Sequence, residues 1–131
     1  MVFGEDDLAD LHSHPVNCTL ELGGARFYLC HAAPSKNLYR YLPSESPDTV
    51  WQDEEAQVEA DFILIGHTHQ RFGKPGGQKT YVNPGSRGQP KGVEPVACYT
   101  LWEDGHVEIR RISYSYARRW LKSTARLWRR T

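Results

Sequence analysis

The chain has 131 residues, 39% of them hydrophobic, and its 16 basic and 16 acidic side chains leave no net charge. This length suits one domain, so we expect a single domain over residues 1–131. The sequence has no apolar run of 18 residues and no basic-then-apolar leader, so we expect neither a membrane span nor a signal peptide. A cytoplasmic protein is then the default expectation.

The neutral total hides an uneven distribution of charge. Residues 1–61 carry a net charge of −9, whereas residues 62–131 carry +9. An acidic solvated face with a basic tail fits this pattern, and so does attraction between the two halves. The three cysteines Cys18, Cys30 and Cys98 form no CxxC pair, which favours reduced thiols, buried at Cys30 and Cys98, over a disulfide or a metal site.

The first half of the chain predicts strands separated by long connections. Residues 1–15 are acidic and indicate a loop or a short helix. Residues 18–22 and 25–30 are typical of a β-hairpin around Gly23 and Gly24. A long surface loop with Tyr39 and Tyr41 and a helix over residues 52–59 precede residues 62–65, which predict a strand buried on both faces.

The second half predicts a turn around residues 73–77, a short strand at 80–82 and a hairpin of residues 96–102 and 106–112. Residues 113–131 predict a basic amphipathic helix, because apolar residues recur at helical spacing between arginines and lysines. The helix suits docking on the core with a solvated basic face, or contact with a partner or an anionic surface. No specific nucleic-acid-binding motif is present.

Polar residues follow three of the predicted strands. His31 follows residues 25–30, His67 and His69 follow residues 62–65, and an Asn-Pro-Gly-Ser loop at 83–86 follows residues 80–82. Ligand sites in α/β sheets gather at the carboxyl ends of strands. If the chain remains extended, His67 and His69 point to the same side, and Gly66 leaves room for close approach. The spacing therefore predicts a metal site.

In these motifs the chain resembles the calcineurin-like metallophosphoesterase superfamily, and within it the small prokaryotic phosphodiesterase-type members. His31 in Cys-His-Ala-Ala-Pro is similar to the family's penultimate motif, and residues 66–69 are similar to its closing Gly-His-x-His. The loop at 83–86 is similar to the segment that follows. The likeness covers roughly residues 16–117.

The resemblance implies an α/β fold, the C-terminal part of a four-layer αββα sandwich with mixed β-sheets and flanking helices. It implies two divalent ions, drawn from Mn, Fe, Zn, Ni or Co, with His31 and His67 on one ion and His69 on the other. Such a pair activates water and neutralises a phosphoryl group during hydrolysis of a phosphoester substrate. Arg87, which follows the loop at 83–86, is a candidate contact for a substrate phosphate oxygen, and a surface arginine is the alternative.

The family's first three motifs, Asp-x-His, Gly-Asp and Gly-Asn-His-Asp, have no counterpart here in a matching context. Residues 10–12 spell Asp-Leu-His, but acidic residues precede them in place of a buried strand. We therefore expect a C-terminal portion that is inactive alone, carries the histidine-rich half of a site, and needs an N-terminal half or self-association. The alternative is a non-catalytic interaction module like the phosphoesterase-like subunit of the retromer coat.

Overall fold

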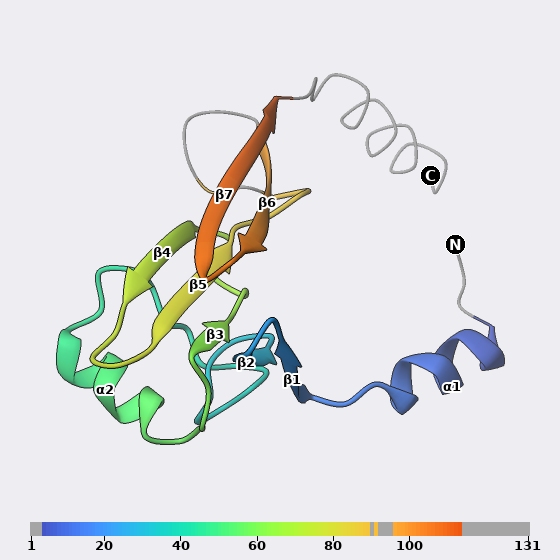
Figure 1. The fold of residues 1–131 in the computed structure, drawn as a ribbon. Coiled ribbons are helices and arrows are strands. Elements are labelled where there is room, and N and C mark those ends of the chain that lie inside the picture. Colours follow the sequence, from blue (N-terminus) through green and yellow to red (C-terminus); the bar gives the residue numbers. More distant parts are fainter. Residues whose placement is uncertain (1–3, 90, 92–95, 114–131) are drawn as a thin grey trace.

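The computed structural model describes residues 4–89, 91 and 96–113, which form a mixed α/β fold (Figure 1). A five-stranded sheet has the strand order β1-β2-β3-β5-β4, and a two-stranded sheet, β6-β7, lies beside it. The strands are β1 (Asn17–Leu22), β2 (Ala25–Cys30), β3 (Phe62–Leu64), β4 (Arg71–Pro75), β5 (Thr80–Pro84), β6 (Val96–Glu103) and β7 (His106–Ser113), and the described helices are α1 (Glu5–Ser13) and α2 (Asp48–Glu55).

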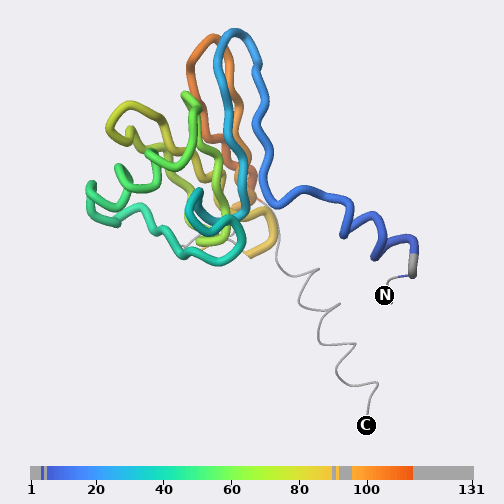
Figure 2. Tube along the Cα trace, turned by 90° about the horizontal axis from the view of Figure 1, so that it is seen from below, coloured from blue at the N-terminus to red at the C-terminus, as the bar shows by residue number. Residues whose placement is uncertain are grey.

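Both predicted hairpins are confirmed. β1 and β2 pair antiparallel around Gly23 and Gly24, whose φ angles of 55° and 78° are the left-handed values that a two-residue turn needs. β6 and β7 pair around Asp104 and Gly105. The two hairpins lie side by side (Figure 2), and the Trp102 ring occupies the space that a Cβ on Gly23 would need.

The centre of the large sheet is parallel. β2 pairs in parallel with β3, and β3 with β5, so their carboxyl ends lie at one edge of the sheet. Tyr28, Ile63 and Tyr81 stand in one row across these strands and are buried against Trp51 of α2. The Trp51 and Tyr81 ring centroids are 4.6 Å apart. Burial of each of these side chains contributes roughly 1.5–3 kcal/mol.

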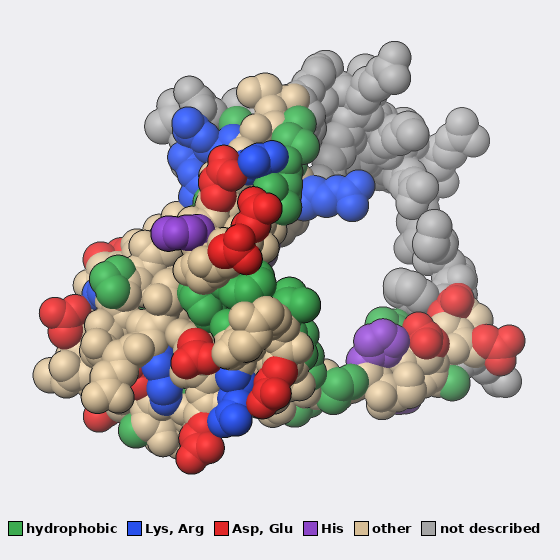
Figure 3. Space-filling model, viewed as in Figure 1, with side chains coloured by type: hydrophobic (Ala, Val, Ile, Leu, Met, Phe, Trp, Pro, Cys, Tyr) green, Lys and Arg blue, Asp and Glu red, His purple; other side chains and the backbone are tan. Residues whose placement is uncertain are grey.

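The opposite face of the sheet is only partly covered. Phe27 and Phe62 stack with ring centroids 5.0 Å apart, and Trp102 of β6 packs edge-on against both rings. Leu20 and Leu22 of β1 are exposed, and apolar side chains gather where the hairpins meet (Figure 3). The prediction that residues 62–65 are buried on both faces therefore holds fully only on the α2 side, because the β6-β7 hairpin is narrower than the sheet.

The predicted helix over residues 52–59 was misplaced, since α2 begins at Asp48 and ends at Glu55. Pro47 precedes the first turn, where a proline costs no backbone hydrogen bond. At the other end the Lys79 ammonium donates to the carbonyl oxygens of Glu55 and Val58. This lysine contact from the β4-β5 turn helps to end the helix and is invisible in the local sequence.

The predicted turn at residues 73–77 was too long, because Gly73 and Pro75 belong to β4. β4 is an edge strand, where a proline removes no ladder hydrogen bond that the sheet requires. Only the segment between β4 and β5 turns. There the Glu55 carboxylate accepts backbone N–H bonds from Gln78 and Lys79.

Of the loop and the short helix expected for residues 1–15, the structure shows the helix, α1. It stands away from the sheet, with Leu8 and Leu11 exposed (Figures 1 and 2). The basic amphipathic helix predicted at residues 113–131 lies outside the described residues apart from Ser113, which ends β7. Neither described helix has the length and hydrophobicity needed to cross a membrane. Cys18, Cys30 and Cys98 are free thiols; Cys18 is exposed, and Cys30 and Cys98 are half-buried rather than fully buried.

Candidate metal centre

The segments that follow β2, β3 and β5 meet at the carboxyl edge of the sheet, as expected. The Gly66 N–H donates to the His31 carbonyl oxygen over 2.9 Å, and the Ile65 N–H donates to the Val82 carbonyl oxygen over 2.9 Å. A Cβ on Gly66 would lie 3.3 Å from the His31 oxygen, so glycine permits this approach. Backbone hydrogen bonds thus hold the two histidine segments side by side.

Two of the three predicted ligands are in contact. His31 Nε2 lies 3.1 Å from His67 Nδ1, and the ring centroids are 5.0 Å apart at an interplanar angle of 69°. His31 is exposed and His67 is half-buried, so the pair lies open to solvent at the edge of the sheet. The two nitrogens face each other across a distance that one proton or one metal ion can bridge.

His69 is held separately from this pair. Its Nδ1 lies 3.0 Å from the Gln89 carbonyl oxygen. A carbonyl oxygen only accepts, so Nδ1 carries the proton, and in the neutral ring Nε2 is left with a free lone pair. Across the described residues, no group of three or more His, Cys, Asp or Glu side chains is gathered closely enough to hold a metal ion.

The backbone around the histidines is not extended. The expectation that His67 and His69 point to the same side assumed an extended chain, and this assumption was wrong. The φ angles of His67 and His69 are 61° and 60°, in the left-handed region that non-glycine residues rarely occupy. The Thr68 N–H donates to the Gly66 carbonyl oxygen, closing a three-residue turn centred on His67. The chain therefore leaves the β3 direction at once, and the two side chains need not share one side.

Asn83 holds this turn, a role that the sequence motif did not reveal. Its side chain is fully buried, and Nδ2 donates to the Gly66 carbonyl oxygen over 2.8 Å and to Thr68 Oγ1 over 3.0 Å. Its Oδ1 accepts the Gly85 N–H over 2.9 Å. One amide thus connects the histidine turn after β3 to the loop after β5.

Glu54 of α2 anchors the loop that follows His31. Its buried carboxylate accepts from the Ser35 N–H and hydroxyl and from Arg40 Nε over 2.7–2.8 Å. In the same loop Asn37 Nδ2 donates to the Tyr28 hydroxyl. The loop is therefore held at several points although it contains no helix or strand. The role of Glu54 was not predicted from the sequence, because its acidic neighbours suggested a solvated face of the helix.

This loop places Tyr41 against the histidine pair. The Tyr41 and His67 ring centroids are 6.0 Å apart. Lys91 Nζ donates to the Tyr41 hydroxyl over 2.8 Å and lies 4.9 Å from the centroid of that ring. The backbone of Lys91 is fixed as well, because its N–H donates to the His69 carbonyl oxygen over 3.2 Å.

Arg87 lies at the same edge of the sheet, in the segment after β5, and its side chain is exposed. It forms no hydrogen bond or ion pair with another described residue. Beneath the site, burial raises the pKa of the Cys30 thiol to about 11, and burial also raises the pKa of the Tyr28 hydroxyl. Both groups are therefore uncharged at neutral pH.

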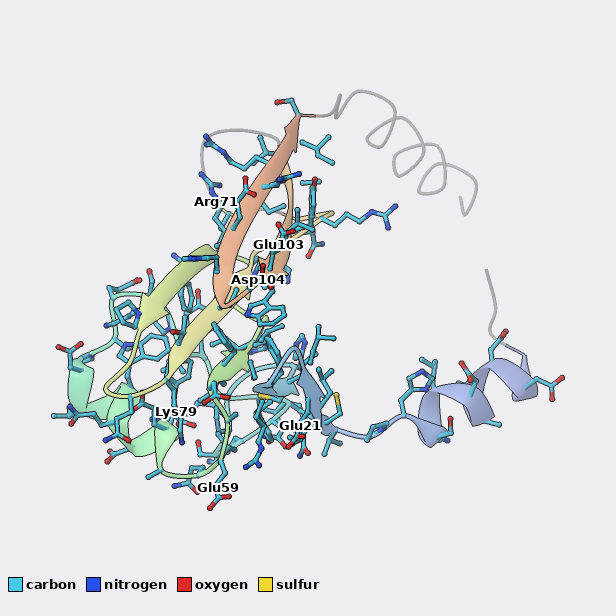
Figure 4. All side chains as sticks on the ribbon, in the orientation of Figure 1. Glu21, Glu59, Arg71, Lys79, Glu103 and Asp104 are labelled. Carbon is cyan, nitrogen blue, oxygen red and sulfur yellow. The ribbon has the colours of Figure 1, made fainter. Side chains whose placement is uncertain are left out.

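A pocket of about 500 Å³ lies at the opposite edge of the sheet. Its walls include Glu21, Arg26, Glu59, Asp61 and Lys79, near the amino ends of β2, β3 and β5. Glu21, Glu59 and Lys79 are labelled in Figure 4. Arg26 forms ion pairs with Glu21 and Glu59, and Lys79 binds the end of α2. The pocket is thus separate from the histidines, and its cations already have partners.

The fold is a mixed sheet in which histidines follow two neighbouring parallel strands, β2 and β3. The chain belongs to the calcineurin-like phosphoesterase superfamily, whose domain model matches residues 1–104. A comparison with curated proteins found no match.

Solved structures share the fold. A hypothetical protein from Pyrococcus horikoshii is 16% identical with a TM-score of 0.81 over 96% of this chain and 50% of its own. A metallophosphoesterase from Sphaerobacter thermophilus is 19% identical with a TM-score of 0.69 over 88% of this chain and 55% of its own. A Vps29 mutant from Entamoeba histolytica is 22% identical with a TM-score of 0.50 over 79% of this chain and 63% of its own. The chain spans about half the length of the first two.

Proposed function

We propose that the chain supplies histidine ligands to the divalent metal centre of a phosphoesterase that acts on phosphodiesters or phosphomonoesters. The main observation that supports the proposal is the 3.1 Å distance between His31 Nε2 and His67 Nδ1. Metal–nitrogen bonds of about 2.0–2.1 Å place two imidazole nitrogens of one ion roughly 2.9–3.4 Å apart. The observed separation falls within this range, so the two nitrogens are close enough to be ligands of one ion.

His69 suits the second ion. Its Nδ1–H bond to the Gln89 carbonyl leaves Nε2 free, which is the arrangement that orients many histidine ligands in metal sites. Neutral imidazole ligands suit Mn, Fe, Zn, Ni or Co. An ion takes about four to six donors, so carboxylates from outside this histidine cluster must complete the site.

Bound divalent ions supply Lewis-acid neutralisation of a phosphoryl group and activation of water. The residues of this chain hold and orient the ions: Asn83 fixes the turn of His67, and Glu54 fixes the loop after His31. Arg87 is exposed at the same edge and is proposed to meet a phosphate oxygen. Because the described ligand set is partial, we expect little hydrolysis of bis(p-nitrophenyl) phosphate by these 131 residues alone.

Metal binding tests the proposal directly. Titration with Co²⁺, followed by its visible absorption and by calorimetry, is expected to show binding that weakens about tenfold or more in His31→Ala and in His67→Ala. His12→Ala is the matched control, since His12 is an exposed histidine of α1 and should bind as the unmodified chain does. Equal affinity in all four proteins would refute the metal centre.

The likeness to Vps29 favours a second candidate, a non-catalytic interaction module that keeps the phosphoesterase fold. Hydrolysis separates the two functions. A chain extended by any sequence encoded upstream is assayed on bis(p-nitrophenyl) phosphate with Mn²⁺, beside the same chain carrying His67→Ala. Activity that His67→Ala removes supports the enzyme, and metal binding without hydrolysis in the extended chain supports the module.

A further inference from the structure

Lys91 and Tyr41 form a pair beside the histidines that the metal centre does not use. Three segments bring them together: the loop after β2 carries Tyr41, the turn after β3 carries His67, and the segment after β5 carries Lys91. Tyr41 packs edge-on against His67, while the Lys91 backbone is bonded to His69. Lys91 is thus held beside the histidines by its backbone bond to His69 and by the contact of its ammonium with Tyr41.

The pair has hydrogen-bond donors to spare. The Tyr41 hydroxyl accepts from Lys91, and its own proton is bonded to none of the described residues. The ammonium has three donors, of which Tyr41 takes one, and it forms no ion pair with a carboxylate of the described segments. Tyr41 is 49% exposed and Lys91 is exposed, so both groups are accessible.

We propose that Lys91 and Tyr41 form a phosphate-binding subsite beside His67, an inference that rests on the proposed function. An ammonium is a strong partner for phosphate oxygens, and its contact with Tyr41 limits the number of positions that this flexible side chain adopts. The subsite would bind a phosphoryl oxygen of the substrate and orient the phosphoester toward ions held by the histidines. The Lys91 side chain is held in place by its contact with Tyr41, whereas the exposed Arg87 side chain has no such contact with a described residue.

The test measures inorganic phosphate binding by calorimetry, with and without one equivalent of Co²⁺. In Lys91→Gln the dissociation constant for phosphate is expected to rise about tenfold or more, which is the usual effect of losing a charged hydrogen bond. Tyr41→Phe should give a smaller rise. Added salt should weaken phosphate binding more in the unmodified chain than in Lys91→Gln.

Arg26→Gln is the matched control, because it removes one positive charge at the opposite edge of the sheet. It should change phosphate affinity less than twofold, and both Lys91→Gln and Arg26→Gln should keep the Co²⁺ affinity. Equal phosphate affinity in these two variants, with or without Co²⁺, would overturn the subsite. So would a loss of Co²⁺ binding in Lys91→Gln, which would show that Lys91 only positions the histidines. Failure of Co²⁺ to bind the unmodified chain would count against the metal centre, leaving the metal-free titration to decide on the subsite.

Discussion

The buried Asn83 amide donates to the Gly66 carbonyl oxygen over 2.8 Å and so connects β5 to the turn that carries His67. Asn83→Asp keeps the shape but loses both donors and places a carboxylate beside a carbonyl oxygen. We expect a loss of about 2–3 kcal/mol in the free energy of unfolding, measured with urea, together with weaker Co²⁺ binding. Gln52→Glu, at an exposed position of α2, is the control for the change from amide to carboxylate and should change little.

The left-handed backbone of His69 predicts an unusual ranking of two variants. A side chain at φ 60° costs about 1–2 kcal/mol, whereas glycine adopts this conformation without that cost. His69→Gly should therefore be more stable than His69→Ala by about 1 kcal/mol in thermal and urea unfolding. If alanine were the more stable variant, the backbone at His69 could not be left-handed in solution.

The buried Glu54 carboxylate predicts coupling between α2 and the proposed metal centre. Glu54→Gln weakens the ion pair with Arg40 and the bonds from Ser35, so we expect a loss of about 2–3 kcal/mol in stability. It should also lower Co²⁺ affinity through the loop after His31. Asp53→Asn, on an exposed position of the same helix, should alter neither property.

Cys18 should react with iodoacetamide before Cys30 at pH 8. Cys18 is exposed, whereas Cys30 is half-buried and burial raises its pKa to about 11. Only about one thousandth of Cys30 is then thiolate, the reactive form, and this fraction increases as the pH rises toward 11. Mass spectrometry should find Cys18 modified first, and preferential early modification of Cys30 would contradict the burial.

The partly covered face of the sheet predicts self-association. Leu20 and Leu22 are exposed on the edge strand β1, and unpaired edges with apolar side chains favour contact with another chain. Size exclusion with light scattering should show a species larger than 15.0 kDa that Leu22→Lys shifts toward the monomer. A stable monomer at every concentration would rule out this expectation.

Local sequence patterns predicted both hairpins, the β3 strand and the polar residues that follow the ends of the strands. These features depend on short-range chemistry: Gly23 and Gly24 permit the turn, and alternation or continuity of apolar residues selects a strand. The bounds of α2 and β4 were not predictable in this way. Lys79 helps to end α2 from 24 residues beyond Glu55, and the edge position that tolerates Pro75 exists only in the assembled sheet.

In the candidate site, too, some features follow from the sequence and others only from the tertiary structure. The sequence by itself identified His31, His67 and His69 as candidate metal ligands, since they follow predicted strands in a recognisable order. Only the tertiary structure decided that His31 faces His67, that His69 turns to Gln89, and that Lys91 meets Tyr41. The physical reason is that long-range hydrogen bonds, above all those of Asn83 and Glu54, impose a left-handed turn and a fastened loop that local propensity does not specify.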